Sequence, residues 1–138
     1  MSAVVPELLV SDLEASLSFW VGLLGFKVRY DRTEERFTYL RRFECDVMLE
    51  EVSGVGRKWI TAPLEKPFGR GINFQFEAND WSRPLENLQE QQWPLYLAPE
   101  DKWYRAGDEE VGQRQFLVQD PDGYLLRLCQ PIGRRKLS

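Results

Sequence analysis

The side chains available for chemistry are carboxylates, arginines and aromatic rings, because the 138-residue sequence contains no histidine. Without histidine, neither a serine–histidine nor a cysteine–histidine nucleophile can form, and imidazole cannot hold zinc, iron or nickel. The two cysteines, Cys45 and Cys129, show no metal-binding or redox spacing, so we expect reduced, unreactive thiols. Carboxylates alone remain able to hold a metal ion.

One arginine interrupts an otherwise apolar segment. The segment DPDGYLLRLCQ, residues 120–130, begins with an Asp-Pro-Asp-Gly turn and continues as a strand. Because side chains alternate along a strand, Arg127 shares one face with Leu125 and Cys129. Three interpretations stay open, namely an edge charge, half of an ion pair, or the lining of a ligand cavity.

The composition is that of one soluble globular domain, with 43% hydrophobic and 29% charged residues. The net charge of −4 disfavours nucleic acid as a partner and suits a cationic ligand. No apolar run approaches the roughly 20 residues that cross a bilayer, so we expect no membrane association. The N-terminal segment MSAVVPELLV lacks a basic region and a long apolar core, which predicts a cytoplasmic protein.

The first half of the chain predicts one helix among four strands. Ser11 and Glu14 form a capping box at the start of a helix over about 12–24. The apolar residues that follow at helical spacing are Leu13, Leu17, Trp20 and Leu24. The segment AVVPELLV precedes this helix as a strand, and the segments FKVRYDR, RFTYLRRF and DVMLEEV follow it as three more.

The same order of elements returns in the second half. A strand INFQFEA and a helix WSRPLENLQEQQ are followed by a strand PLYLAP, a polar loop EDKWYRAGDEEVG, and strands QRQFLVQ and YLLRLCQ. Both halves therefore have the order βαβββ, which is typical of a duplicated unit. The sequence predicts an α+β fold with a first module over about 1–55, a linker over 56–70, a second module over about 71–130 and a mobile basic tail over 131–138.

The repeated βαβββ order and the segments VSDLEASLSFWVGLLGF and FLVQDPDGYLLRL resemble the vicinal oxygen chelate superfamily. That superfamily includes glyoxalase I, extradiol dioxygenases, fosfomycin resistance enzymes and bleomycin resistance proteins. The resemblance extends over nearly the whole chain. It implies a single domain, residues 1–138, with two modules around a U-shaped groove, and a homodimer in which strands are often swapped.

Enzymes of this superfamily hold a divalent metal through side chains of the first and last strands of each module. Those positions fall near Val5, at Glu50, near residues 71–72 and at Arg127. Only Glu50 offers a metal ligand, and a guanidinium at Arg127 would repel a metal ion. We therefore expect no metal, no cofactor and no catalytic residue. A two-residue shift would bring Glu7 beside Glu50, which keeps a metal-dependent lyase or dioxygenase as an alternative.

The metal-free branch that remains is that of the bleomycin resistance proteins. The resemblance implies non-catalytic binding of a flat, cationic, bleomycin-type glycopeptide in a groove at the dimer interface. Phe37 and Trp103 fall near groove-lining and stacking positions of that branch, and Trp59 is a second tryptophan in a polar loop. The candidate ligand-binding residues are Phe37, Tyr39, Glu50, Trp59, Trp103 and Arg127. Two alternatives stay open: Glu50 and Arg127 pair with one another, and the ligand is an unrelated aromatic metabolite.

Overall fold

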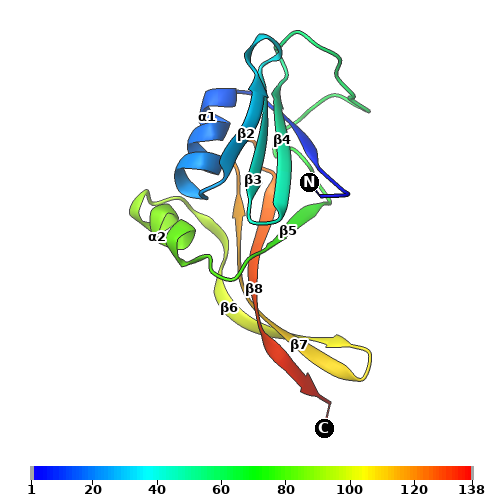
Figure 1. The fold of residues 1–138 in the computed structure, drawn as a ribbon, viewed down its shortest axis with the longest axis vertical. Helices are drawn as coiled ribbons and strands as arrows, with labels where there is room; N and C mark the ends of the chain where they lie inside the picture. Colours follow the sequence, from blue (N-terminus) through cyan, green and yellow to red (C-terminus); the bar gives the residue numbers. More distant parts are fainter. Residues whose placement is uncertain (1, 138) are drawn as a thin grey trace. The chain divides into compact units, whose positions relative to one another are not determined.

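The computed structural model describes residues 2–137, which form two compact units. Unit 1 runs to Arg70 and also includes Asp120–Tyr124, whereas unit 2 comprises Gly71–Gln119 and the chain from Leu125 onward. Each unit carries a four-stranded sheet and an α-helix (Figure 1). The predicted α+β fold of two βαβββ modules is confirmed. No helix within the described part of the chain is long and apolar enough to cross a bilayer.

Unit 1 buries one face of its sheet beneath a helix. Its elements are β1 (Glu7–Val10), α1 (Leu13–Leu17), the π-helix η1 (Ser18–Leu23), β2 (Lys27–Arg32), the 3-10 turn η2 (Thr33–Glu35), β3 (Phe37–Arg42) and β4 (Cys45–Glu51). The strand order is β1-β4-β3-β2, with β1 parallel to β4 and the other pairs antiparallel. The buried side chains of the strands and helix include Leu8, Val10, Leu40, Val47, Leu49, Phe19 and Trp20. Burial of these apolar groups is the main stabilising contribution to this unit.

The helix over 12–24 is present as α1 followed by η1, but its predicted capping box is wrong. Asp12 is the N-cap, and its Oδ1 accepts a hydrogen bond from the Ala15 amide at 3.2 Å. The Ser11 hydroxyl instead donates to Asp122, 111 positions further along the chain. A tertiary partner therefore replaces the local cap that the sequence favours.

The Asp-Pro-Asp-Gly turn packs into unit 1. Asp120 and Asp122 are 3% and 1% exposed, and the Tyr124 hydroxyl donates to the Leu9 carbonyl at 2.8 Å. Gly123 has a φ of +100°, and a Cβ built there would lie 2.5 Å from the Pro67 Cβ. Only glycine fits this backbone conformation and close approach.

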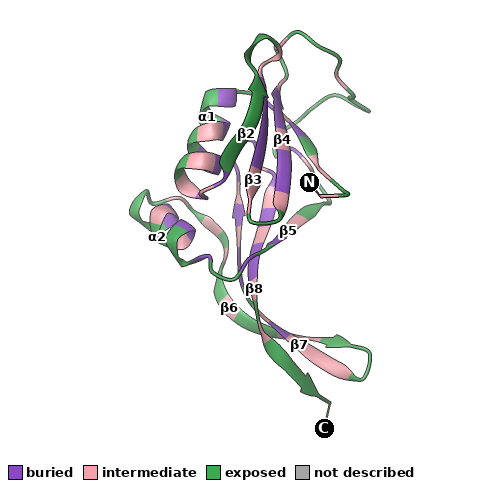
Figure 2. Ribbon diagram, in the orientation of Figure 1, coloured by how far each residue is buried: buried purple, intermediate pink, exposed green. Residues whose placement is uncertain are grey.

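Unit 2 has the strand order β5-β8-β7-β6. Its elements are β5 (Asn73–Glu77), α2 (Ser82–Glu90), β6 (Leu95–Ala106), β7 (Glu109–Gln119) and β8 (Leu125–Lys136). The strand and helix side chains of its core include Phe76, Leu88, Phe116, Val118, Leu126 and Leu128. Figure 2 shows that the buried residues of β7 and β8 lie mostly in the part near β5, and that the far ends of β6 and β8 are exposed.

The far part of β6, β7 and β8 corrects two predictions. The segment EDKWYRAGDEEVG is a long hairpin of β6 and β7, not a loop, and β8 continues to Lys136 where a mobile tail was expected. Ser138, the last residue of the expected tail, lies outside the described residues. Backbone pairing and cross-strand ion pairs hold these polar strands without an apolar pattern. The ion pairs are Arg114–Asp101, Arg134–Glu109 and Arg135–Glu110.

Candidate functional site

The polar face of the unit 1 sheet holds two neighbouring carboxylates and a lysine. Glu7 on β1 and Glu50 on β4 lie close enough for the Glu50 carboxylate to act on Glu7, and Glu50 is only 5% exposed. Burial, together with the hydrogen bond and charge of Glu50, raises the pKa of Glu7. The Lys58 ammonium lies 3.0 Å from Glu50 Oε1 and 2.9 Å from the Gly54 carbonyl oxygen. Lys58 therefore supplies the positive charge that the buried Glu50 needs.

This arrangement does not fit a divalent metal. The carboxylate pair is the donor set that the metal-dependent alternative requires, but the Lys58 ammonium is hydrogen-bonded to one of its oxygens. A metal ion bound by both carboxylates would have to displace that ammonium or lie beside it against its charge. The ion pair of Glu50 is thus formed with Lys58 from its own unit, whereas the sequence suggested Arg127.

Phe37 and Tyr39 lie on the same polar sheet face, but both rings are 2% exposed. The Arg32 guanidinium lies 3.9 Å from the centre of the Phe37 ring, and the Tyr30 ring stacks on Tyr39 with centroids 5.0 Å apart. The Tyr39 hydroxyl donates to buried Asp46 at 2.8 Å. These contacts account for the burial of both rings, so a ligand would meet Tyr30 and Arg32 before it met Phe37 or Tyr39.

The two candidate tryptophans differ in exposure. Trp59, in the loop after β4, is 69% exposed, with the Arg57 guanidinium 4.3 Å from its ring centre. Trp103 on β6 is half-buried, with Arg135 4.1 Å from its ring centre. Its ring also rests on Gly112 of β7, where an added Cβ would come within 2.9 Å of it. Trp59 is therefore the open ring, whereas the Trp103 ring is covered by Gly112 of β7 and Arg135 of β8.

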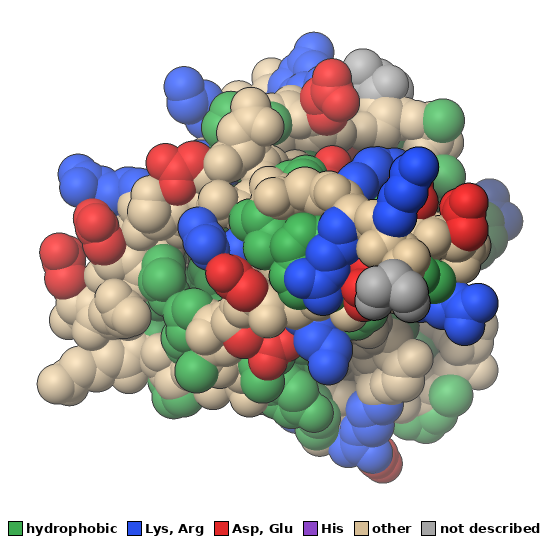
Figure 3. Space-filling view, turned by 90° about the horizontal axis from the view of Figure 1, so that it is seen from below, with side chains coloured by type: hydrophobic (Ala, Val, Ile, Leu, Met, Phe, Trp, Pro, Cys, Tyr) green, Lys and Arg blue, Asp and Glu red, His purple; other side chains and the backbone are tan. Residues whose placement is uncertain are grey.

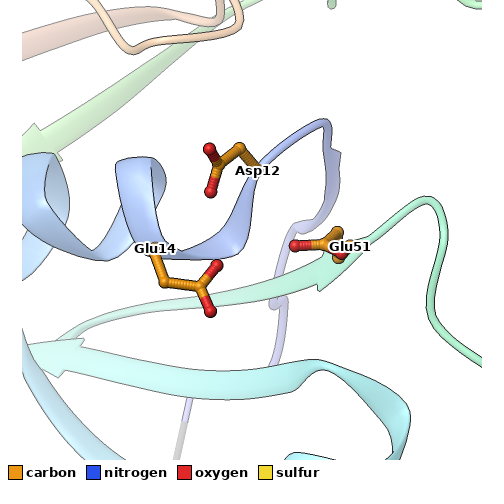
Figure 4. A group of neighbouring side chains, drawn as sticks. All are labelled: Asp12, Glu14 and Glu51. Atoms are coloured by element: carbon orange, nitrogen blue, oxygen red, sulfur yellow. The ribbon is translucent and has the colours of Figure 1, made fainter.

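A second carboxylate cluster lies at the start of α1 (Figure 4). Oxygens of Asp12, Glu14 and Glu51 lie within 4.8 Å of one another. The Arg36 guanidinium donates to both Glu14 and Glu51, and the Leu13 amide donates to Glu51. These bonds, led by that from Arg36, lower the pKa of Glu51 to about 2. Arg36 thus takes the place that a bound cation would have, and the cluster joins helix to sheet.

The polar face of the unit 2 sheet contains a cavity of about 390 Å³ that includes Arg127. Gln115 is 3% exposed, and its Nε2 donates to Glu100 at 3.0 Å and to the Tyr104 hydroxyl at 2.6 Å. Arg127 donates through Nη2 to the side-chain oxygen of Gln75. The cavity is lined by Asn73, Leu97, Glu100, Tyr104, Gln115, Leu117 and Arg127.

Of the three interpretations of Arg127, the lining of a cavity describes its position. Sequence reasoning missed Glu100 and Tyr104 because it assigned them to a loop, and it missed Gln115 although the strand QRQFLVQ was predicted. The alternation of glutamines in the segment QRQ is the one sequence signal that places Gln115 on a polar face. The other predicted residues divide between the units: Phe37, Tyr39, Glu50 and Trp59 belong to unit 1, and Trp103 and Arg127 to unit 2.

Comparison with known families gives one assignment. The model of the Glyoxalase/Bleomycin resistance protein/Dioxygenase superfamily matches residues 3–128. The chain belongs to this superfamily. The predicted membership is therefore confirmed, and with it the two-module fold. A search of proteins with curated functions gives no match.

Several solved structures resemble the chain. A glyoxalase/bleomycin resistance protein/dioxygenase superfamily member from Vibrio splendidus 12B01 is 41% identical, with 90% of this chain and 94% of that chain covered and a TM-score of 0.40. TioX from Micromonospora sp. ML1 is 17% identical over 94% of this chain and 98% of that one, with a TM-score of 0.70. A lactoylglutathione lyase from Agrobacterium tumefaciens is 16% identical over 94% of each chain, with a TM-score of 0.59. The last two structures share the fold of this chain.

Proposed function

We propose that this superfamily member binds a small organic molecule and releases it chemically unchanged. The observation that carries the proposal concerns two of the positions where the superfamily's enzymes need metal ligands: a cationic side chain is bonded to the carboxylate at one of them, and an arginine occupies the other. Lys58 is bonded to Glu50 in unit 1, and Arg127 stands on the last strand of unit 2. A metal-dependent lyase or dioxygenase requires carboxylate or imidazole groups there. The proposal includes a homodimer in the cytoplasm.

The specific ligand that the resemblance suggests is a flat, cationic, bleomycin-type glycopeptide. The exposed ring of Trp59 supports stacking of a planar group, and Trp103 would contribute once Arg135 leaves its face. The net charge of −4 favours a cationic molecule at long range. The carboxylates of the hairpin give little further support, because Glu109 and Glu110 are each paired with an arginine. On the face drawn in Figure 3, basic and acidic side chains are likewise interspersed.

Titration with metal-free bleomycin in the presence of a chelator tests this proposal. We expect saturable quenching of tryptophan fluorescence at micromolar drug, a higher melting temperature, and recovery of intact drug by mass spectrometry. Trp59→Phe should remove much of the quenching, whereas Trp93→Phe, which alters a ring bonded to the Gln119 carbonyl, should not. An unchanged emission spectrum together with an unchanged melting temperature would exclude a bleomycin-type ligand.

A second candidate ligand is an aromatic metabolite unrelated to bleomycin. It is favoured by the cavity of unit 2, whose volume of about 390 Å³ suits a small planar molecule better than a glycopeptide. A thermal-shift screen of small aromatic acids, amides and amines separates the two candidates. Stabilisation by such compounds without any effect of bleomycin would favour the metabolite.

A further inference from the structure

The unit 2 cavity has hydrogen-bonding groups at fixed places on its wall. What we infer about its ligand rests on the proposed non-catalytic binding. All four strands of the sheet contribute to its wall, so the cavity is held by backbone pairing on a rigid element. Leu97, Leu117 and the Tyr104 ring supply apolar contact, and Arg127, Glu100 and Gln115 supply polar contact. Apolar contact surfaces combined with a few convergent polar groups are typical of a small-molecule site.

Arg127 is a guanidinium without an acidic partner among residues 2–137. Among the described residues its one hydrogen bond is donated to the neutral amide oxygen of Gln75, and its buried Nε meets no acceptor there. Arg114, Arg134 and Arg135 of the same unit, by contrast, are each paired with a carboxylate. A buried donor left without an acceptor costs about 1–3 kcal/mol. A ligand that brings an acceptor to Arg127 would remove this cost.

Gln115 presents the complementary group. Because its Nε2 donates to Glu100 and to Tyr104, the amide is oriented with its Oε1 away from both. This buried oxygen receives no hydrogen bond from any residue that the structure describes. The Tyr104 hydroxyl accepts from Gln115 and keeps its own hydrogen available for donation. The cavity wall therefore offers a donor at Arg127 and an acceptor at Gln115.

We propose that this cavity binds an aromatic carboxylic acid that carries a hydrogen-bond donor beside its carboxylate. The carboxylate pairs with the Arg127 guanidinium, whose planar fork matches its two oxygens. The neighbouring amino or hydroxyl group donates to Gln115 Oε1. The ring lies against Leu97, Leu117 and Tyr104. Glu100 already contributes one negative charge to the wall, so a monoanion binds and a second negative group on the ligand is disfavoured.

Three ring-matched probes test the proposal on the full-length chain by isothermal titration calorimetry. Anthranilate has the carboxylate and the adjacent donor, benzoate has only the carboxylate, and benzylamine has a cation instead. We expect the wild-type chain to bind anthranilate most tightly, benzoate roughly 3- to 10-fold more weakly, and benzylamine not at all, since one neutral hydrogen bond separates the first two probes.

Two substitutions assign the contacts. Arg127→Gln should weaken anthranilate and benzoate alike by about tenfold or more, because a charge-assisted bond is lost. Gln115→Leu should reduce anthranilate to the affinity of benzoate and leave benzoate unchanged. Arg57→Gln, an exposed arginine of unit 1, is the matched control and should change neither affinity. Melting temperature and near-ultraviolet circular dichroism without ligand establish that each variant folds.

Preferential binding of benzylamine would overturn the proposal, as would an Arg127→Gln variant that binds anthranilate like the wild type. The absence of binding by any probe at about 10 mM, where even millimolar affinities are visible, would also overturn it. Recovery of the probe by chromatography separates this inference from the proposed function. If anthranilate binds through Arg127 and is consumed, the proposed non-catalytic function is wrong but the assignment of the cavity stands. If anthranilate is recovered intact and Arg127→Gln does not weaken its binding, the assignment of the cavity is wrong but the non-catalytic function stands.

Discussion

Ser11 and Asp122 are 111 positions apart in the chain, yet the backbone amide of Ser11 donates to Asp122 Oδ2 at 3.0 Å and its hydroxyl donates to Oδ1. Asp122 is 1% exposed and also has the Lys66 ammonium 3.5 Å from Oδ1. The contact fixes the Asp-Pro-Asp-Gly turn to the start of the first helix. It also explains why Ser11 does not act as the helix cap.

Removal of this contact should destabilise the fold. We expect Asp122→Ala to lower the free energy of unfolding by about 3 kcal/mol, because two donors of Ser11 lose their buried acceptor, and Ser11→Ala to lower it by about 1 kcal/mol. Urea denaturation measures both. Asp108→Asn, at the exposed tip of the β6–β7 hairpin, is the control and should stay near the wild-type value. Equal stability of Asp122→Ala and the control would contradict this role of the turn.

Asp120 should make the protein less stable as pH rises above the ordinary pKa of an aspartate side chain. Burial raises its pKa from 3.8 to about 6, and the turn amides and Trp20 Nε1 only partly offset that burial. Below pH 3.8 both folded and unfolded chains are protonated at this group, and the stability is lost as pH rises through 6, by up to about 3 kcal/mol.

Comparison of the wild type with Asp120→Asn by urea denaturation from pH 4 to pH 7 measures this effect. The asparagine variant starts less stable, because its amide nitrogen faces the Trp20 N–H, and the gap to wild type narrows as pH rises. A gap that stays constant over this range would show that Asp120 titrates normally.

Glu51 should make the protein less stable as pH falls, which is the opposite of the effect of Asp120. The Arg36 guanidinium, with the Leu13 amide, holds the pKa of Glu51 at about 2, below its ordinary 4.5. The stabilisation is complete above pH 4.5 and is lost as pH falls through 2. We expect about 1–2 kcal/mol from this pair, because solvent screens part of the interaction.

Urea denaturation between pH 5 and pH 2 measures this loss as the difference between wild type and Glu51→Gln. The difference should shrink as the medium becomes more acidic, since the variant has no carboxylate to protonate. Parallel stability curves for the two proteins would mean that the Arg36–Glu51 pair has no net effect.

Lys58 should control whether the Glu7–Glu50 pair accepts a metal ion. In the wild type we expect Mn²⁺, Ni²⁺ and Zn²⁺ to leave the melting temperature unchanged, because the Lys58 ammonium is bonded to Glu50. Lys58→Met removes that charge and leaves two adjacent carboxylates. A metal at 100 times its Kd would then stabilise the variant by about 2.7 kcal/mol.

Differential scanning fluorimetry with and without each ion gives the comparison. Lys58→Met combined with Glu7→Gln is the matched control and should lose the response to metal. Stabilisation of the wild type by any of the three ions would favour the metal-dependent alternative over non-catalytic binding.

The sequence by itself determined the order of elements and the superfamily. Period-two and period-3.6 patterns, with the Asp-Pro-Asp-Gly turn, depend on neighbouring residues only, and they predicted the helix over 12–24 and the repeat of βαβββ correctly. The same patterns failed for residues 100–112 and 131–136, because the polar strands there are held by cross-strand pairing that no local pattern reveals.

Tertiary structure alone decided which charges meet. Lys58 reaches Glu50 from a loop without regular structure, and Arg36 reaches Glu14 across 22 positions. Ion pairing depends on distances of a few ångströms, which residue types and spacing do not encode. The amino-acid sequence showed that Arg127 interrupts an apolar strand. Only the fold showed that the guanidinium lacks an acidic partner among the described residues and lines a cavity beside Gln115.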